Sequence, residues 1–193
     1  MREKIDDWRA QNARKIIDKA RRKLVATGGV PLEQAHPRLV YITLDHGSWH
    51  DQDEVQEMWA GLLASSCSRD GRDEGNLIFI NILSQMTVNE LAILSHACET
   101  ATKIASPGGL ITAATLECDL ELVQSISGID DVHRLDRELD HLRSLGLFPY
   151  GFSPLDRELV ADITPSSLAL HMYVRCQGFT GSPLVYFGLS NSE

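Results

Sequence analysis

The stretch from Asp51 to Ala64 constrains the fold more than any other part of this sequence. Asp51 and Glu54 stand at the spacing of a capping box, where acidic residues suit the positive end of a helix dipole. The apolar residues that follow recur at the spacing of one buried helical face, and they are Val55, Met58, Trp59, Leu62 and Leu63. We therefore expect a buried helix, with Trp59 at its centre and neighbouring helices packed around it.

Composition places the chain among ordinary globular proteins. Its 193 residues are 43% hydrophobic and 23% charged, which is enough to bury a core in one domain or two small ones. No apolar run approaches the roughly 20 residues that a membrane-spanning helix needs. The charged first residues do not resemble a signal peptide. We expect a cytoplasmic location and four buried free thiols, since the cysteines are widely spaced.

The sequence from about Glu3 to Ala26 predicts one long basic helix. Between positions 2 and 23 there are nine basic and four acidic residues, although the whole chain has a net charge of -9. Thr27-Gly28-Gly29 should end the helix through a left-handed cap. The face that the basic residues form is either simply solvated or contacts a membrane surface or nucleic acid. Our candidate interaction surface is Arg14, Lys15, Arg21, Arg22 and the more distant Trp49, which is also a candidate dimer contact.

Two further segments complete the N-terminal half. Residues 38–45 are apolar and β-branched, as in a strand, but their place between two helical patterns favours a short buried helix. The segment His46 to His50 should then be a loop. Thr87 and Glu90 form a second capping box.

Ser106-Pro107-Gly108-Gly109 marks a break, which we take as a subdomain boundary. Beyond it we expect a helix capped by Asp130 or Asp131, a hairpin formed by 148–150 and 159–163, and a last helix opened by Thr164-Pro165. This order is that of a winged helix. The predicted fold is mainly α, with a helical bundle at 1–105, a winged-helix-like α+β unit at 110–177 and an extended tail at 178–193.

The motif E-V-Q-E-M-W-A-G-L-L-A (54–64), followed by a charged loop and F-I-N-I-L-S-Q-M-T-V-N-E-L-A-I-L (79–94), resembles the abortive-infection alpha family. L-D-H-L-R-S-L-G-L-F (139–148) and D-I-T-P-S-S-L-A-L (162–170) extend the resemblance over about residues 10 to 177. The chain departs at Ser166-Ser167, where the family often has Leu-Gly, and at His46 to His50. The resemblance implies bacterial anti-phage defence, and it carries no catalytic residues.

Motifs for chemistry are few. His46 and His50 stand four residues apart, as zinc ligands on a helix do, but Gly47-Ser48 argues against a helix and no third ligand is assigned by spacing. No G-x-S-x-G elbow occurs, and Gly28-Gly29 and Gly108-Gly109 match neither a P-loop nor a dinucleotide fingerprint. We expect no cofactor and no enzymatic activity.

Two functions of different classes remain open. The first is a non-enzymatic protein of a defence system that contacts an unknown protein partner, phage-derived or a defence component, or a second copy of itself. The second is a winged-helix regulator that binds nucleic acid. The predicted recognition helix carries five acids against three arginines, which disfavours contact with phosphates. A metal-dependent hydrolase at His46 and His50 is a third option.

Overall fold

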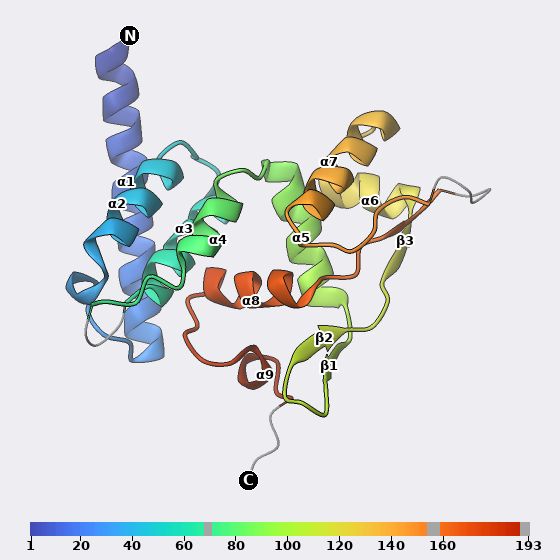
Figure 1. Cartoon of the computed structure of the whole chain (residues 1–193). Coiled ribbons are helices and arrows are strands. Elements are labelled where there is room, and N and C mark those ends of the chain that lie inside the picture. The colour runs from blue at the N-terminus through green and yellow to red at the C-terminus, as the bar shows by residue number, and fades with distance from the viewer. Residues whose placement is uncertain (68–70, 154–158, 190–193) are drawn as a thin grey trace. The chain divides into compact units, whose positions relative to one another are not determined.

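The computed structural model describes residues 1–67, 71–153 and 159–189, and this part is mainly helical with two small antiparallel strand pairs (Figure 1). The predicted mainly α character is therefore confirmed. The chain groups into two compact units, one formed by residues 1–85 with 174–180 and the other by residues 86–173 with 181–189. Within the described ranges, none of the helices combines the length and the apolar content that crossing a bilayer requires.

The first unit is built around α3. It contains α1 (Arg2–Thr27), the short 3-10 helix η1 (Leu32–Gln34), α2 (Pro37–Gly47), α3 (Asp53–Ser65), α4 (Leu77–Leu83) and the last turn of α8. Helix α1 packs mainly against α3, and α2 packs against both. Trp59 on α3 is 0% exposed, which confirms its predicted place in the core. The helix predicted over 38–45 is also confirmed, as α2.

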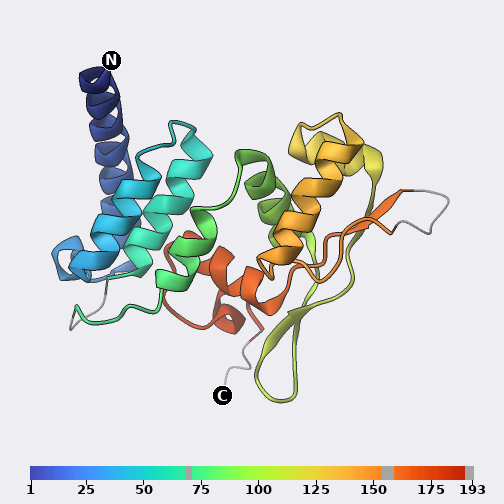
Figure 2. The ribbon, with the colours of Figure 1, turned by 45° about the horizontal axis from the view of Figure 1, so that its top comes forward.

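The C-terminal end of helix α1 is capped, whereas its N-terminal turns are exposed. Gly28 adopts a left-handed conformation with φ 63° and its amide donates to the carbonyls of Leu24 and Val25, so the predicted cap is confirmed. At the other end, residues 1–7 are exposed, and Figures 1 and 2 show these first turns extending beyond α2 and α3. The face of α1 that packs on α3 is therefore uncovered at its start.

Two local predictions in this unit are wrong. Helix α3 begins at Asp53 with Gln52 as its N-cap and no side-chain cap, so Asp51 and Glu54 form no capping box. His46 and Gly47 belong to the last turn of α2 instead of a loop. A Cβ at position 47 would lie 2.9 Å from Ile16 Cδ1 and 3.0 Å from Trp59 Cγ. Glycine at this position therefore lets α2 come close to its neighbours.

The second unit begins with α5 (Val88–Thr100). Its N-terminus has the predicted capping box, because the Thr87 hydroxyl accepts from the Glu90 amide and the Glu90 carboxylate accepts from the Thr87 amide. A hairpin of β1 (Lys103–Ala105) and β2 (Ile111–Ala113) follows. The break predicted at Ser106 to Gly109 is the turn of this hairpin.

The remaining elements of this unit are β3 (Glu117–Asp119), α6 (Leu120–Ser127), α7 (Val132–Ser144), β4 (Val160–Asp162), α8 (Ser167–Cys176) and α9 (Pro183–Tyr186). Asp131 caps α7 through the amides of His133 and Arg134, as predicted. The inner face of α7 is Leu135, Leu139 and Leu142, each 0% exposed.

Three predictions in this unit need correction. Strand β4 pairs with β3. Residues 148–150 form no strand, and residues 151–153 pair with β4 in their place, through the bridge between Phe152 and Ala161 and through backbone hydrogen bonds from the Asp162 amide to the Gly151 carbonyl and from the Ser153 amide to the Val160 carbonyl. Residues 154–158 of the expected hairpin lie outside the described residues. Helix α8 begins after Ser166, whose hydroxyl accepts from the Ala169 amide, so Thr164 is not its cap. The segment expected to be an extended tail contains the helix α9.

Candidate protein-binding groove

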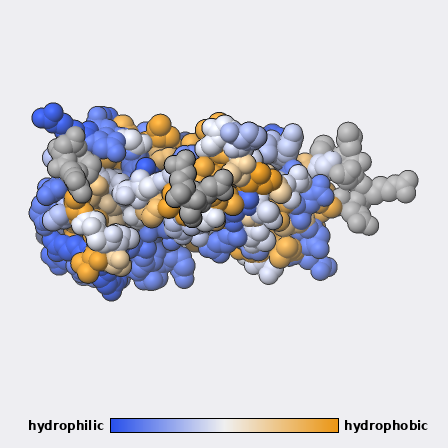
Figure 3. All heavy atoms as spheres, turned by 90° about the horizontal axis from the view of Figure 1, so that it is seen from below, coloured by the Kyte–Doolittle hydropathy of each residue, from blue (hydrophilic) through white to orange (hydrophobic). Residues whose placement is uncertain are grey.

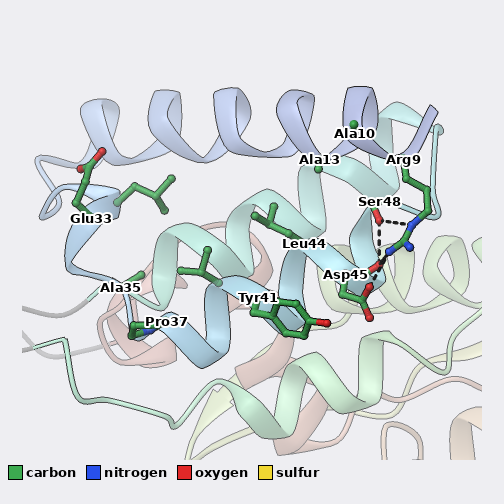
Figure 4. Close-up of a pocket in the computed structure, with 12 residues that line it drawn as sticks. Arg9, Ala10, Ala13, Glu33, Ala35, Pro37, Tyr41, Leu44, Asp45 and Ser48 are labelled. Atoms are coloured by element: carbon green, nitrogen blue, oxygen red, sulfur yellow. Dashed lines mark hydrogen bonds and ion pairs between the residues drawn. The ribbon is translucent and has the colours of Figure 1, made fainter. Parts of the chain in front are cut away.

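An open, mainly apolar groove of about 690 Å³ runs between α1 and α2 in the first unit (Figure 4). The groove exists because α1 presents small residues where α2 presents large ones, and Tyr41 on its wall stays 70% exposed. The apolar lining is formed by Ala10, Ala13, Leu32, Ala35, Pro37, Val40, Tyr41 and Leu44. Such a concave apolar surface with few polar groups is the usual form of a binding groove.

Arg9 forms a rigid polar end of the groove, and Figure 4 shows its guanidinium turned toward the end of α2. Its Nη2 donates to the carbonyl and the carboxylate of Asp45, at 2.9 and 2.7 Å, and its Nε donates to the Ser48 hydroxyl at 3.0 Å. The guanidinium carbon also lies 4.3 Å from the centre of the Trp49 ring. One arginine therefore connects α1, α2 and the aromatic residue that follows α2.

Trp49 is held in place while it stays accessible. Its side chain is 53% exposed, and its ring centroid lies 6.5 Å from that of Trp8 on α1. Tryptophan, tyrosine and arginine dominate the binding energy of protein interfaces. A side chain that is already ordered loses little entropy when a partner binds. Trp49 contacts Arg9, and Tyr41 lines the same groove as Arg9. Both aromatic side chains therefore have the properties of interface anchors.

A second ion pair lies at the other end of the groove. Arg21 Nη2 is 3.7 Å from Glu33 Oε1, and Glu33 lines the groove. Arg21 comes twelve residues after Arg9, so the two ion pairs are about 18 Å apart along α1 at 1.5 Å per residue. This length corresponds to about three helical turns.

The basic face of α1 is partly neutralised by the fold. Lys19 is 7% exposed and lies 2.8 Å from Asp53 and 2.6 Å from Glu57 on α3, and Lys23 also pairs with Glu57. Of the predicted interaction surface, Arg21 has the ion pair described above. The other three basic residues, Arg14, Lys15 and Arg22, are exposed and have no ion pair with any described residue.

His46 and His50 lie beside the core tryptophan. Their ring centroids are 6.2 and 6.4 Å from that of Trp59, in stacked orientations. Burial lowers the pKa of His50, against the opposing charge of Asp51. Among described residues, no group of three or more His, Cys, Asp or Glu is placed to hold a metal ion. The metal site at these two histidines thus stays a prediction that lacks a third ligand in the described part of the chain.

The four cysteines are buried free thiols, as predicted. Burial raises the pKa of Cys67 to about 11 and raises that of Cys98 and Cys118. A thiol reacts as a nucleophile only when it is deprotonated, so burial disfavours the reactive form of Cys67, Cys98 and Cys118.

Sequence reasoning did not identify Arg9 or Tyr41. Arg9 is one of nine basic residues near the N-terminus, and its partners Asp45 and Ser48 are more than thirty positions away. Tyr41 was taken only as part of a buried segment. The pair Ala10 and Ala13, small residues on one side of a helix, was the one available sign of a groove.

Exposed apolar residues occur elsewhere as well. Figure 3 shows one face of the molecule, where hydrophobic residues form scattered patches among hydrophilic ones. Scattered apolar side chains are normal on protein surfaces and need no partner. The groove differs from them because its apolar residues line one continuous concave surface.

The fold and the groove together define a mainly helical protein with an apolar groove between its first two long helices. The chain belongs to the abortive infection alpha family, whose model matches residues 9–165. The family's description indicates a role in abortive infection, and the resemblance noted in the sequence is confirmed. Comparison with curated proteins and with solved structures finds no match to this chain.

Proposed function

We propose that this chain acts in abortive-infection defence as a non-enzymatic component, and that its groove between α1 and α2 binds an amphipathic helix of a partner protein. The observation that carries the proposal is the apolar lining of the groove between the Arg9–Asp45 and Arg21–Glu33 ion pairs. An amphipathic helix binds such a groove through anchors at i, i+3 or i+4, and i+7. About three turns fit between Arg9 and Arg21.

The charged residues beside the groove indicate which charges the partner helix should carry. The lining that η1 and α2 contribute includes Glu33 and Asp45, whereas Arg14 and Arg21 are exposed on α1. A helix with an apolar stripe, basic residues on one flank and acidic residues on the other would match both walls. Such matching determines orientation and partner choice more than it determines affinity.

Two substitutions that each introduce an aspartate, one inside the groove and one outside it, test the proposal. Tyr41→Asp places a charge in the groove, and Ile78→Asp places the same charge on α4, where Ile78 is 60% exposed outside the groove. Neither side chain is in the core, so both variants should fold. We expect Tyr41→Asp to lose protection against phage and to weaken the partner at least about 30-fold, as for an interface anchor worth about 2 kcal/mol. Ile78→Asp should retain both.

The readouts are phage yield in cells carrying each variant and recovery of the partner from infected cells. If cells without the gene yield as much phage as cells with it, the defence role is wrong. If Tyr41→Asp protects as well as Ile78→Asp, the groove is not the interface. Sedimentation over a dilution series identifies the case in which the partner is a second copy.

Nucleic-acid binding is the second candidate, and the order of elements in the second unit supports it. After α5 and the β1–β2 hairpin, strand β3, helices α6 and α7 and strand β4 follow one another as in a winged helix, with β3 paired to β4. The exposed face of α7 carries Asp136 and Asp140 beside its arginines, and Arg143 pairs with Asp140. Binding to duplex or single-stranded DNA or RNA that weakens steeply with salt would favour this candidate.

A further inference from the structure

A second cavity of the first unit differs from the groove because polar groups form about half of its lining. Its volume is about 590 Å³, and it lies where the C-terminal ends of α1 and α3 meet residues 175–180. This volume is in the range of small-molecule sites. The charged groups in its lining are Arg175 and Asp73.

Arg175 is a half-buried cation without a close counter-ion among the described residues. Its Nη1 donates to the Phe179 carbonyl at 3.3 Å, which is the one hydrogen bond of the Arg175 side chain to a described residue. No carboxylate oxygen of the described residues lies within 4.0 Å of its guanidinium. Burial lowers the pKa of Arg175, and the carboxylate of Asp73 opposes this from a greater distance. Burial of a charge is costly unless a partner compensates it.

The free part of Arg175 has a defined shape. Because Nη1 is engaged by Phe179, the edge formed by Nε and Nη2 remains without a protein acceptor among the described residues. This edge donates two parallel hydrogen bonds, and it matches a carboxylate or a phosphate. The Ser65 hydroxyl cannot assist, because it already donates to the Leu62 and Arg175 carbonyls and accepts from the Asn76 amide.

The rest of the cavity favours a positive group. Asp73 contributes a carboxylate, and its side chain accepts a hydrogen bond from the Gly75 amide. The C-terminal ends of α1 and α3 also line the cavity, and helix C-termini carry partial negative charge. A dianion such as phosphate would be repelled by these groups, whereas an ammonium group would be attracted.

We propose that this cavity binds a small zwitterion of the amino-acid type, with its carboxylate on the Nε–Nη2 edge of Arg175 and its ammonium group beside Asp73 and the two helix ends. The site does not involve the groove. The side chain of the ligand would lie against Leu24 and Ala64, which supply apolar lining.

The test uses the full chain and simple probes. The common L-amino acids, acetate, methylammonium and inorganic phosphate are titrated at millimolar concentration, while the Arg175 Nε–H resonance is followed by NMR and heats are measured by calorimetry. We expect at least one amino acid to shift that resonance saturably, and acetate and methylammonium to bind at least tenfold more weakly than that amino acid.

Three variants locate the binding. Arg175→Lys keeps the charge but loses the two-donor edge, and Asp73→Asn removes the attraction for the ammonium group. Each should weaken the amino acid at least tenfold, since a hydrogen bond to a charged group contributes about 1.5 kcal/mol or more. Arg22→Met removes an exposed arginine elsewhere on the same unit and should change nothing.

The proposal is overturned if no amino acid binds, in which case Arg175 only stabilises the C-terminal end of α8. It is also overturned if phosphate or acetate binds as tightly as any amino acid, or if Arg175→Lys binds like the wild type. Far-ultraviolet circular dichroism of each variant shows that the comparison is made between folded proteins. A Tyr41→Asp protein should bind the amino acid normally, so the two proposals fail separately.

Discussion

Gly61 on α3 is the position where a single added methyl group should be most damaging. A Cβ at this residue would lie 1.6 Å from the Cys176 carbonyl oxygen, 2.3 Å from its carbon and 3.0 Å from the Gly178 nitrogen. All three atoms are backbone, so no side-chain rotation relieves the overlap. The segment 174–180 would have to move away from α3 by about 1.4 Å to reach even the shortest ordinary contact distance.

Two effects of Gly61→Ala oppose each other. Alanine favours a helix over glycine by about 1 kcal/mol. Overpacking costs about 1–3 kcal/mol, and the upper end applies because the neighbour is backbone. The displacement would also break the hydrogen bond from the Ser65 hydroxyl to the Arg175 carbonyl, now 3.0 Å, at a cost of about 1 kcal/mol. We expect Gly61→Ala to lower the free energy of unfolding by about 3 kcal/mol.

The assay is urea unfolding followed by tryptophan fluorescence, because Trp8, Trp49 and Trp59 all belong to the first unit. Gly28→Ala is the control. No atom lies within 4 Å of its added Cβ, so this variant experiences only the left-handed backbone strain, about 1 kcal/mol. If Gly61→Ala is neutral or stabilising, helix propensity prevails, and the close approach of residues 174–180 to α3 is wrong.

Two further predictions concern polar contacts. Burial by itself raises the pKa of Glu57, but hydrogen bonds from Lys19 and Lys23 outweigh it and lower that pKa below 4.5. Burial lowers the pKa of Lys19, but its bonds to Asp53 and Glu57 raise it above 10.5. The stabilisation is therefore present between these two values, and it is lost as the pH falls through the lowered pKa of Glu57 or rises through the raised pKa of Lys19. Lys19→Met should thus destabilise most near pH 7, and urea unfolding at pH 3 should show a smaller difference from the wild type. Equal differences at both pH values would contradict this reasoning. Thr87→Ala should destabilise the second unit by about 2 kcal/mol, since the hydroxyl caps α5 and donates to the Glu138 carboxylate at 2.9 Å. Thr87→Ser, which retains the hydroxyl, should be nearly neutral in unfolding followed by circular dichroism, and a serine variant as unstable as the alanine variant would refute the role of the hydroxyl.

The helices were predictable because their signals are local. The period of the apolar residues around Trp59 and the left-handed cap at Gly28 each depend on groups within a turn or two of one another. The capping box at Thr87 is equally local, because its two hydrogen bonds connect residues three positions apart. The failure at Asp51 is of the same scale, since the N-cap is Gln52 and the helix begins one residue later than the spacing implies.

The strand pairs were not predictable in this way. Strands of three residues carry too little pattern to identify a partner, and β3 finds β4 more than forty positions away. The hairpin expected between neighbours in sequence was placed a few residues too early on its first side, and the non-local pairing of β4 with β3 was not expected. The turn at Ser106 to Gly109 was recognised as a break, but the short strands on either side of it were not.

By itself, the sequence determined a mainly helical chain with Trp59 in its core and membership of the abortive infection alpha family, because periodicity and family motifs are properties of contiguous residues. Only the tertiary structure decided where binding surfaces form. Arg9 meets Asp45, and Arg175 faces the same cavity as Asp73, because helices distant in sequence bury their apolar faces against one another. The polar groups left at the edges of that packing define the candidate sites, and no local pattern specifies which of them will meet.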